Sequence, residues 1–558
     1  MTLAFLSSRW CRCLTAAFIF AACLQGTSAL AVGCKVAAAH VASEAESAFL
    51  HSDYDRAVTL YQAQLQSNPA DPALTASLTT VLLRQQKVNE AEDIVQKALS
   101  NNPKSAILLT SLGEVQYRQG TPWLAAASID AAMKIDLCYP QLHLLYARLL
   151  RLNSFYASAS KEIATAYSLD PYDPQIRRRW LDTLPINERI SELETYLATG
   201  GGDDPDTIKS LRFYLEYLKQ QLVTPHKACR LVSNTNTATI PFAAMMRDAT
   251  HIRAFGLDVK FNDHNARLQI DTGASGLVIS RSVAEHAGLK QFSRMEVGGI
   301  GSEGRKSGYI AVVDDIKIGS LEFHDCEVRV VDERNVVDND GLIGMDVFSR
   351  FLVTLDYPLR KLLLAPLPPR PDDITPAQPT LETTSDAASA DSSTAETKTS
   401  TPKTVFKGPR DRYVAPEMKD WTHIYRIGHS LLIPASLNNS KLKMFLLDTG
   451  AFSTTISPDV AREVTKVHAN DRMRVHGING KVDNVYSADS ITFHFANISQ
   501  KVEDVVAFAT PSISRSLSME VSGFIGYTAL AQMTIGIDYR DGLMKFSYDP
   551  NRGYKFGQ

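Results

Sequence analysis

The feature that most constrains the fold is an internal duplication in the C-terminal half of the chain. The first copy reads LDVKFNDHNARLQIDTGASGLVIS, then MEVGGIGSEG, DGLIGMDVF and VTLDY. The second reads LLIPASLNNSKLKMFLLDTGAFSTTIS, then RVHGINGKV, SGFIGYTAL and IGIDY. Asp271 precedes Gly344 by 73 positions, and Asp448 precedes Gly526 by 78. Matching elements in the same order at similar spacing predict two units with the same fold.

Both copies consist of short β-branched and aromatic runs broken by Gly, Asn and Asp, a pattern typical of all-β structure. We assign one lobe to residues 246–366 and the other to residues 410–558. Residues 367–409 between them are rich in Pro, Ser, Thr and Asp, so we expect a disordered linker that cannot bury enough apolar surface to order itself.

A 34-residue period occupies the region ahead of the duplication. Pro69, Pro103 and Pro171 lie on one grid, which predicts a helix ended by proline in each unit. Small residues share the period where two helices would cross closely, in three columns: Ala57, Ala91, Ala125 and Ala159; Ala98, Ala132 and Ala166; and Ala45, Thr79, Gly113 and Ala147.

Residues 38–172 therefore resemble tetratricopeptide repeats, with about four units stacked into an all-α solenoid. Such an array is either a spacer or a groove for a peptide or protein partner, and the sequence leaves both open. Apolar residues keep helical spacing beyond it, so we expect residues 173–245 to form a helical cap or connector.

The first residues are typical of an export signal. Arg9 and Arg12 precede an apolar stretch that is too short and too rich in small residues for a membrane span, and residues 29–31 form a small-x-small cleavage site. We predict a signal peptide at residues 1–31, export to the periplasm or the outside of the cell, and no membrane span in the mature chain. The AVGC ending at Cys34 leaves a lipid anchor there as an alternative.

Composition excludes several classes of function. A formal net charge of -3 gives no reason to expect a nucleic acid partner. The four cysteines after the predicted signal have no zinc-ligand spacing, so we expect no metal and no cofactor. Either one disulfide, for example through Cys229, or buried free thiols fit them: Cys34, Cys138, Cys229 and Cys326.

The duplicated Asp-Thr-Gly triplets carry the chemistry. Together with a Gly-rich hairpin and an apolar-apolar-Gly element in each copy, they resemble retropepsin-type and pepsin-like aspartic proteases. The resemblance implies that Asp271 and Asp448 are catalytic and that the lobes pair as a bilobal pseudo-dimer. Two close carboxylates cannot both ionise, so one accepts a proton from water while the other donates to the amide carbonyl. Which aspartate plays which part belongs to the coupled pair.

The residues after each aspartate have implied supporting roles. Thr272 and Thr449 are expected to bond across the lobe interface. Gly273 and Gly450 allow a tight turn and a close backbone approach.

Ser275 fits the family's outer hydrogen-bond position, whereas Phe452 in the second copy departs from it. Ala274 and Ala451 offer no hydroxyl to the carboxylates, so their pKa values should be higher and activity should peak at mildly acidic pH.

Two Gly-rich segments match the family's flaps, hairpins that open and close over substrate. Their predicted residues are Gly298, Gly299, Ile300 and Gly301 in the first copy and Gly477, Ile478 and Gly480 in the second.

The sequence thus predicts an exported aspartic endopeptidase that hydrolyses peptide or unfolded protein, with repeats that recruit the substrate or a partner. The chain would act as a monomer with lobes paired internally or as a homodimer. The alternative is a non-catalytic peptide-binding scaffold with a degenerate protease fold, which Phe452 favours.

Overall fold

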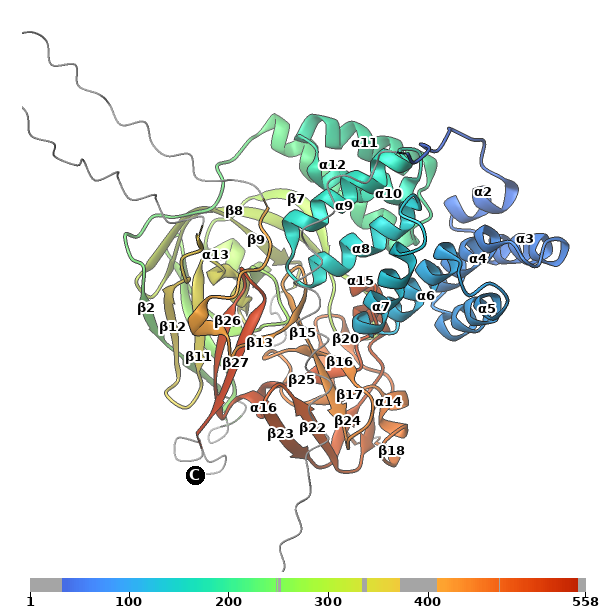
Figure 1. The fold of residues 1–558 in the computed structure, drawn as a ribbon. Helices are drawn as coiled ribbons and strands as arrows, with labels where there is room; N and C mark the ends of the chain where they lie inside the picture. The colour runs from blue at the N-terminus through green and yellow to red at the C-terminus, as the bar shows by residue number, and fades with distance from the viewer. Residues whose placement is uncertain are drawn as a thin grey trace, which may run out of the picture.

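The computed structural model describes residues 33–246, 248, 252–333, 339–371, 409–470 and 472–549. The predicted signal peptide and most of the predicted linker, residues 372–408, lie outside the described residues. Figure 1 shows a helical array on one side of the molecule and two β lobes on the other. In the part of the chain that is described, no helix is long and apolar enough to cross a membrane.

The repeat region folds into four successive helix pairs. Prolines begin the first helix of two units, α4 and α8, and at the start of α4 the Asp71 side chain accepts the Ala73 N–H at 2.8 Å. Pro69, Pro103 and Pro171 follow directly after the second helices. The helices are α2 (Glu44–Leu50), α3 (Tyr54–Ser67), α4 (Pro72–Arg84), α5 (Val88–Asn101), α6 (Ala106–Arg118), α7 (Pro122–Met133), α8 (Pro140–Leu152) and α9 (Tyr156–Leu169).

The periodic small residues lie where the helices meet. Ala57, Ala91, Ala125 and Ala159 are each fully buried. At Gly113 a Cβ would lie 3.0 Å from Leu145 of the next unit, so a larger residue would push neighbouring repeats apart. The small residues that recur every 34 positions thus lie at helix crossings, as the sequence predicted.

The predicted cap is helical only in part. It holds α10 (Pro174–Trp180), the short η1 (Leu181–Thr183), α11 (Ile186–Thr199) and α12 (Pro205–Val223). From Arg230 onward the chain forms strands that pair with the first lobe, so the expectation of a helical connector up to residue 245 was wrong. The apolar spacing ahead of Phe242 is too short to separate a strand from a helix.

The first lobe is a nine-stranded sheet in the order β1-β9-β6-β10-β5-β4-β8-β7, with β3 on β4 and β8 also paired to β9. Its elements are β1 (Arg230–Leu231), β3 (Ala243–Met246), β4 (Ile252–Phe261), β5 (His264–Ile270), β6 (Leu277–Ser280), α13 (Arg281–His286), β7 (Gln291–Val297), β8 (Lys306–Ile318), β9 (Leu321–Val331), β10 (Gly341–Ile343) and η2 (Met345–Phe348).

The second lobe repeats this plan in a ten-stranded sheet, β18-β21-β24-β17-β25-β16-β15-β22-β23 with β14 on β15. In both lobes the strand before the aspartate runs parallel to the strand of the apolar-apolar-Gly element. The elements are η4 (Pro416–Met418), β14 (Tyr425–Ile427), β15 (Ser430–Leu437), β16 (Lys443–Leu447), β17 (Thr455–Ile456), α14 (Pro458–Arg462), β18 (Val467–Ala469), β19 (His476–Gly477), β20 (Gly480–Lys481), β21 (Tyr486–Ala488), β22 (Ile491–Phe495), β23 (Ile498–Val502), β24 (Val505–Ala507), α15 (Pro511–Leu517), β25 (Gly523–Ile525) and α16 (Tyr527–Leu530).

A third sheet joins the lobes within one chain. Its order is β13-β27-β26-β11-β12-β2, and its centre is the antiparallel pair of β11 with β26, where Val353 faces Ile537. Buried side chains from both lobes form one continuous apolar core. The strands are β2 (Ala238–Pro241), β11 (Phe351–Asp356), β12 (Lys361–Pro366), β13 (Thr422–His423), β26 (Met533–Asp538) and β27 (Leu543–Tyr548).

The helical repeats pack directly on the second lobe. Leu145 and Leu149 of α8 share an apolar cluster with Leu432 and Met444 of that lobe. At the end of α6, the Glu520 N–H donates to the Arg118 carbonyl at 2.8 Å. The array is therefore fixed against the lobe rather than tethered to it.

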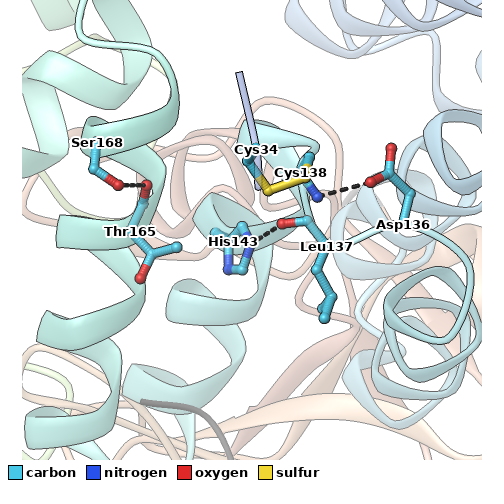
Figure 2. The surroundings of a disulfide bond; sticks show 7 residues. All are labelled: Cys34, Asp136, Leu137, Cys138, His143, Thr165 and Ser168. Carbon is cyan, nitrogen blue, oxygen red and sulfur yellow. Dashed lines mark hydrogen bonds between the residues drawn. A yellow bond between two sulfur atoms is a disulfide. The ribbon is translucent and has the colours of Figure 1, made fainter. Parts of the chain in front are cut away.

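Two disulfides pair the four cysteines that follow the predicted signal. Cys34 bonds to Cys138 in the turn between α7 and α8, as Figure 2 shows. Cys229 bonds to Cys326 of β9 and fixes the connector to the first lobe. The sequence left one disulfide or free thiols open, and spacing alone could not reveal which cysteines the fold brings together.

The start of the predicted linker belongs to the folded lobes. Arg370 is buried and pairs with the buried Asp541 carboxylate, and the Pro368 carbonyl accepts an N–H of Arg540 at 2.8 Å. The boundary predicted at residue 366 was therefore too early. The composition of the segment is typical of a linker, but the ion pair of Arg370 with the buried Asp541 fixes its first residues to the lobes.

Candidate active site

Asp271 and Asp448 lie in equivalent loops at the ends of β5 and β16. The backbone N–H of Asp271 donates to the Ile343 carbonyl at 3.0 Å, and that of Asp448 donates to the Ile525 carbonyl at 3.1 Å. The strands β10 and β25 thus hold both loops from the side. The GLIG and GFIG segments of the two copies supply these two strands.

Thr272 and Thr449 lock the two loops together. Each hydroxyl accepts the backbone N–H of the other threonine, at 3.0 and 3.1 Å. Each hydroxyl also donates to a carbonyl of the opposite lobe, Thr272 to Leu447 at 2.8 Å and Thr449 to Ile270 at 3.2 Å. These four bonds are buried, so they fix the separation of the two aspartates.

Gly273 and Gly450 are required by the approach of the opposite carboxyl group. A Cβ on Gly450 would lie 2.5 Å from Cγ of Asp271, and a Cβ on Gly273 would lie 2.9 Å from Cγ of Asp448. Each loop therefore packs its glycine backbone against the aspartate of the other lobe. Any side chain at these positions would force the carboxyl groups apart.

The two carboxyl groups are buried and share one environment. Oδ1 of Asp271 accepts the N–H groups of Gly273 and Ala274 at 2.7 and 3.1 Å, and Oδ1 of Asp448 accepts those of Gly450 and Ala451 at 2.9 and 3.1 Å. Burial, followed by the charge of Asp448, raises the pKa of Asp271 well above its usual range. Burial also raises the pKa of Asp448, although its hydrogen bonds oppose the rise. The pair therefore retains a proton where ordinary aspartates have lost theirs.

The lobes differ at the outer hydrogen-bond position. Ser275 donates to Asp346 at 3.1 Å, and Asp346 also accepts the N–H of Gly276 at 2.8 Å. In the second lobe the Phe452 ring is 45% exposed and lies beside the Tyr527 ring, with centroids 6.4 Å apart. The serine thus braces its loop through Asp346 and makes no hydrogen bond to Asp271. Phe452 therefore removes a brace and leaves the donors to Asp448 in place.

The two predicted flap tips meet over the site. The Asn479 N–H donates to the Ile300 carbonyl at 2.8 Å, and its side-chain amide donates to the Gly299 carbonyl at 2.9 Å. Ile478 packs against apolar residues of the first lobe, whereas Ile300 packs against the cluster of the second lobe. Each tip thus crosses to the opposite lobe. The remaining predicted flap residues lie within these two hairpins: Gly298, Gly301, Gly477 and Gly480.

Two residues of the site were not predicted from the sequence. His429, in the turn before β15, donates from Nε2 to the Gly273 carbonyl at 3.0 Å, and burial lowers its pKa. Asn479 is 3% exposed, and its Oδ1 has no hydrogen-bond partner among the described residues. A single histidine far from both triplets carries no sequence signal, but Asn479 lies inside a flap motif whose glycines and isoleucine alone were singled out.

Among the described residues, one group could supply three metal ligands, and it is remote from the dyad. Asp315, Glu322 and His324 lie on the β8–β9 hairpin with ligand atoms within 4.8 Å of one another. Lys317 Nζ lies 3.5 Å from Asp315 and 3.8 Å from Glu322. The Lys317 ammonium group therefore already neutralises part of the carboxylate charge that would bind a cation.

Comparison with known proteins agrees with this geometry. The aspartyl protease family matches residues 257–347 and again residues 433–529, and a tetratricopeptide repeat family matches residues 48–112. DNA damage-inducible protein 1 of Neurospora crassa is 30% identical over 110 residues, which are 19% of this chain and 24% of that protein. The chain therefore spans about a quarter of that relative.

A thermophilic tetratricopeptide repeat protein of Thermus thermophilus covers 30% of this chain and 90% of its own, at 21% identity and a TM-score of 0.24. The family matches place two retropepsin-like segments behind a repeat region.

Proposed function

We propose that this chain, whose two β lobes are of the aspartyl protease type, is an exported aspartic endopeptidase that cuts peptide or unfolded protein. The observation that carries the proposal is the shared site. The glycine of each catalytic loop packs so closely on the opposite carboxyl group that an added Cβ would lie within 3 Å of it. Hydrogen bonds between Thr272 and Thr449 hold the two loops in this arrangement. A pair of buried carboxyl groups held this way supports catalysis by two aspartates.

The raised pKa values indicate how the pair would act. With one proton between them, the ionised carboxylate can take a proton from a bound water molecule. The protonated partner can donate to the carbonyl oxygen of the peptide, and water attack then breaks the amide bond. Closed flaps would exclude bulk water from the site while this happens.

The environment of Asp448 favours catalysis over a degenerate scaffold. A relic lobe would be free to lose the donors that hold its carboxylate, yet Gly450 and Ala451 supply the same two N–H bonds as their counterparts in the first lobe. Phe452 lies on the outer side of the loop against Tyr527. Its presence weakens support for the loop without altering the reacting group.

The disulfides support the exported location. Disulfides form and persist in oxidising compartments, and the chain carries two that fix its N-terminal residues and its connector. The sulfur of Cys34 is bonded to Cys138, so it is not free to carry a lipid in this fold. We accordingly propose the periplasm or the cell exterior, with the repeats delivering the substrate.

The test is cleavage of a reduced, carboxymethylated protein by the wild-type chain, Asp271→Asn and Asp448→Asn, with Asp263→Asn as a control on an exposed aspartate of the first lobe. We expect both site variants to lose cleavage, the control to keep it, and the wild type to be most active at mildly acidic pH. Residual cleavage by Asp448→Asn that rises with protein concentration would instead indicate a dimer of first lobes. An inactive wild type would favour the scaffold.

A further inference from the structure

A cavity of about 360 Å³ lies at the junction of the repeats with the second lobe. Its helical wall comes from α6, α8, α9 and α10, and includes Leu144, Arg148 and Arg151 on one face of α8. The opposite wall comes from the second lobe, through Arg426 in β14 and Ser518 after α15. This volume is in the range of small-ligand sites, and neither domain forms it alone.

The cavity carries an excess of positive charge. Four arginines line it, Arg148, Arg151, Arg179 and Arg426, against one carboxylate, Asp182. Arg148 is paired with Glu114 through Nη1 at 2.7 and 2.8 Å. Arg151 and Arg179 are exposed, and neither has a hydrogen-bond or ion-pair partner among the described residues. Arg426 already donates from Nη1 to the Tyr539 carbonyl and from Nη2 to the Gly428 carbonyl, and its Nε is buried without a partner.

The arginines are also close to one another. The surrounding protein, followed by the like charges of Arg178 and Arg148, lowers the pKa of Arg179 to about 10. The same two kinds of cause lower the pKa of Arg118, one helix away, to about 10. An anion in the cavity would offset this repulsion and pair the free guanidinium groups, which bind carboxylates in a fixed fork geometry.

The cavity borders the turn that contacts the loop of Asp271. Arg426, Ile427 and Gly428 line it, and the next residue, His429, donates to the Gly273 carbonyl beside the dyad. One residue of extended chain spans about 3.5 Å, so a bound peptide needs only a few residues to reach from the dyad to this turn.

We propose that this cavity is a subsite for a carboxylate of the peptide substrate, held by Arg151 and Arg179, with Arg426 adding positive charge on the opposite wall. It deepens the proposed function, on which it rests, by assigning the enzyme acidic substrates. The carboxylate comes either from an Asp or Glu side chain or from the C-terminus of the peptide. The repeats then contribute directly to substrate binding, as the helical wall of the subsite.

Binding is tested first in the full-length Asp271→Asn chain, which separates recognition from cleavage. The probe is fluorescein-labelled Ala-Val-Ala-Leu-Phe-Ala-Val-Ala as the free acid, as the amide, and as the amide with one terminal Ala replaced by Glu or by Gln. We expect the free acid or the Glu peptide to bind at least about tenfold more tightly than its neutral partner, and added salt to reduce the difference. Equal binding of acidic and neutral peptides would overturn the proposal, and comparison of the two acidic forms identifies the source of the carboxylate.

Arg151→Gln and Arg179→Gln should each reduce this preference about tenfold. Arg350→Gln is the matched control, because it removes an equal charge from an exposed site in the first lobe, outside the cavity. In the active enzyme, the cavity variants should raise KM for the acidic peptide and leave kcat/KM for the amide unchanged. Preferential binding without cleavage by the wild type would refute the protease and keep the subsite, whereas cleavage that ignores both arginines would refute the subsite alone.

Discussion

The coupled dyad should make the stability of the lobes depend on pH in a way that Asp271→Asn abolishes. Burial and the neighbouring Asp448 raise the pKa of Asp271 in the folded chain. The unfolded chain has the ordinary pKa of aspartate, about 3.9. Above that pH the folded chain holds a proton that unfolding releases, so the free energy of unfolding falls as pH rises, until the raised pKa is passed.

The size of the effect follows from one retained proton. Linkage gives about 1.4 kcal/mol for each pH unit in that window, or about 3 kcal/mol over two units. Asparagine keeps the shape of the protonated acid, since its Oδ1 can accept the Gly273 and Ala274 N–H groups and its amide can donate to Asp448. The variant therefore holds no proton to lose at this position, and we expect it to gain stability over the wild type as pH rises.

The assay is urea unfolding from pH 4 to 7, followed by fluorescence of Trp421, which packs on Gly536 in the sheet shared by the lobes. Replacing Trp123 and Trp180 by Phe removes the signals of the repeats and of the cap helix α10. Asp448→Asn should change the slope as Asp271→Asn does, because the proton belongs to the pair, whereas Asp263→Asn should follow the wild type. Parallel stability curves for the wild type and both site variants would show that the carboxyl groups do not share a proton.

Three further outcomes follow from the structure. Gly450→Ala would place a methyl group 2.5 Å from Cγ of Asp271, so kcat should fall by about 100-fold or more with an unchanged circular dichroism spectrum, and near-normal turnover would contradict the close approach. Joint replacement of Cys229 and Cys326 by Ser opens a link across 97 positions and should destabilise the chain by about 4 kcal/mol in urea titrations; an unchanged midpoint would argue against the bond. Phe452→Ser alters a half-exposed ring away from the carboxylates, so kcat/KM should stay within about threefold, and a larger change would mean that the ring contacts substrate.

Both lobes and the repeats could be predicted from the sequence, because the sequence pattern of each occurs at least twice in the chain. Gly450 occupies the same position in the second copy as Gly273 in the first. Close packing around one of these glycines therefore implies close packing around the other. The alanine columns of the repeats work in the same way, since identical helix crossings demand the same small residue each time. Duplication thus converts a weak local signal into a strong one.

Features that occur once could not be predicted. His429 supports the loop of the other lobe only because the turn before β15 folds against it. Arg370 fixes the start of the predicted linker by bonding to Asp541, which lies 171 positions further along the chain. The packing of α8 on the second lobe likewise leaves no repeated pattern, because each apolar contact there is made by a different pair of residues.

The two flaps, equivalent in the sequence, differ in what surrounds them. The first is the end of the long β7–β8 hairpin, and α12 lies along β7, with Lys209 paired to Glu296 and Arg294 paired to Glu216 at 3.1 Å. The second consists of two-residue strands, β19 and β20, and depends on the first for the bonds of Asn479. Exposed ion pairs are individually weak, but these two along one strand, added to a continuous sheet, leave the first flap better supported. Duplicated sequence therefore gives equivalent loops around Asp271 and Asp448 but unequal flaps, because α12 lies along the first flap.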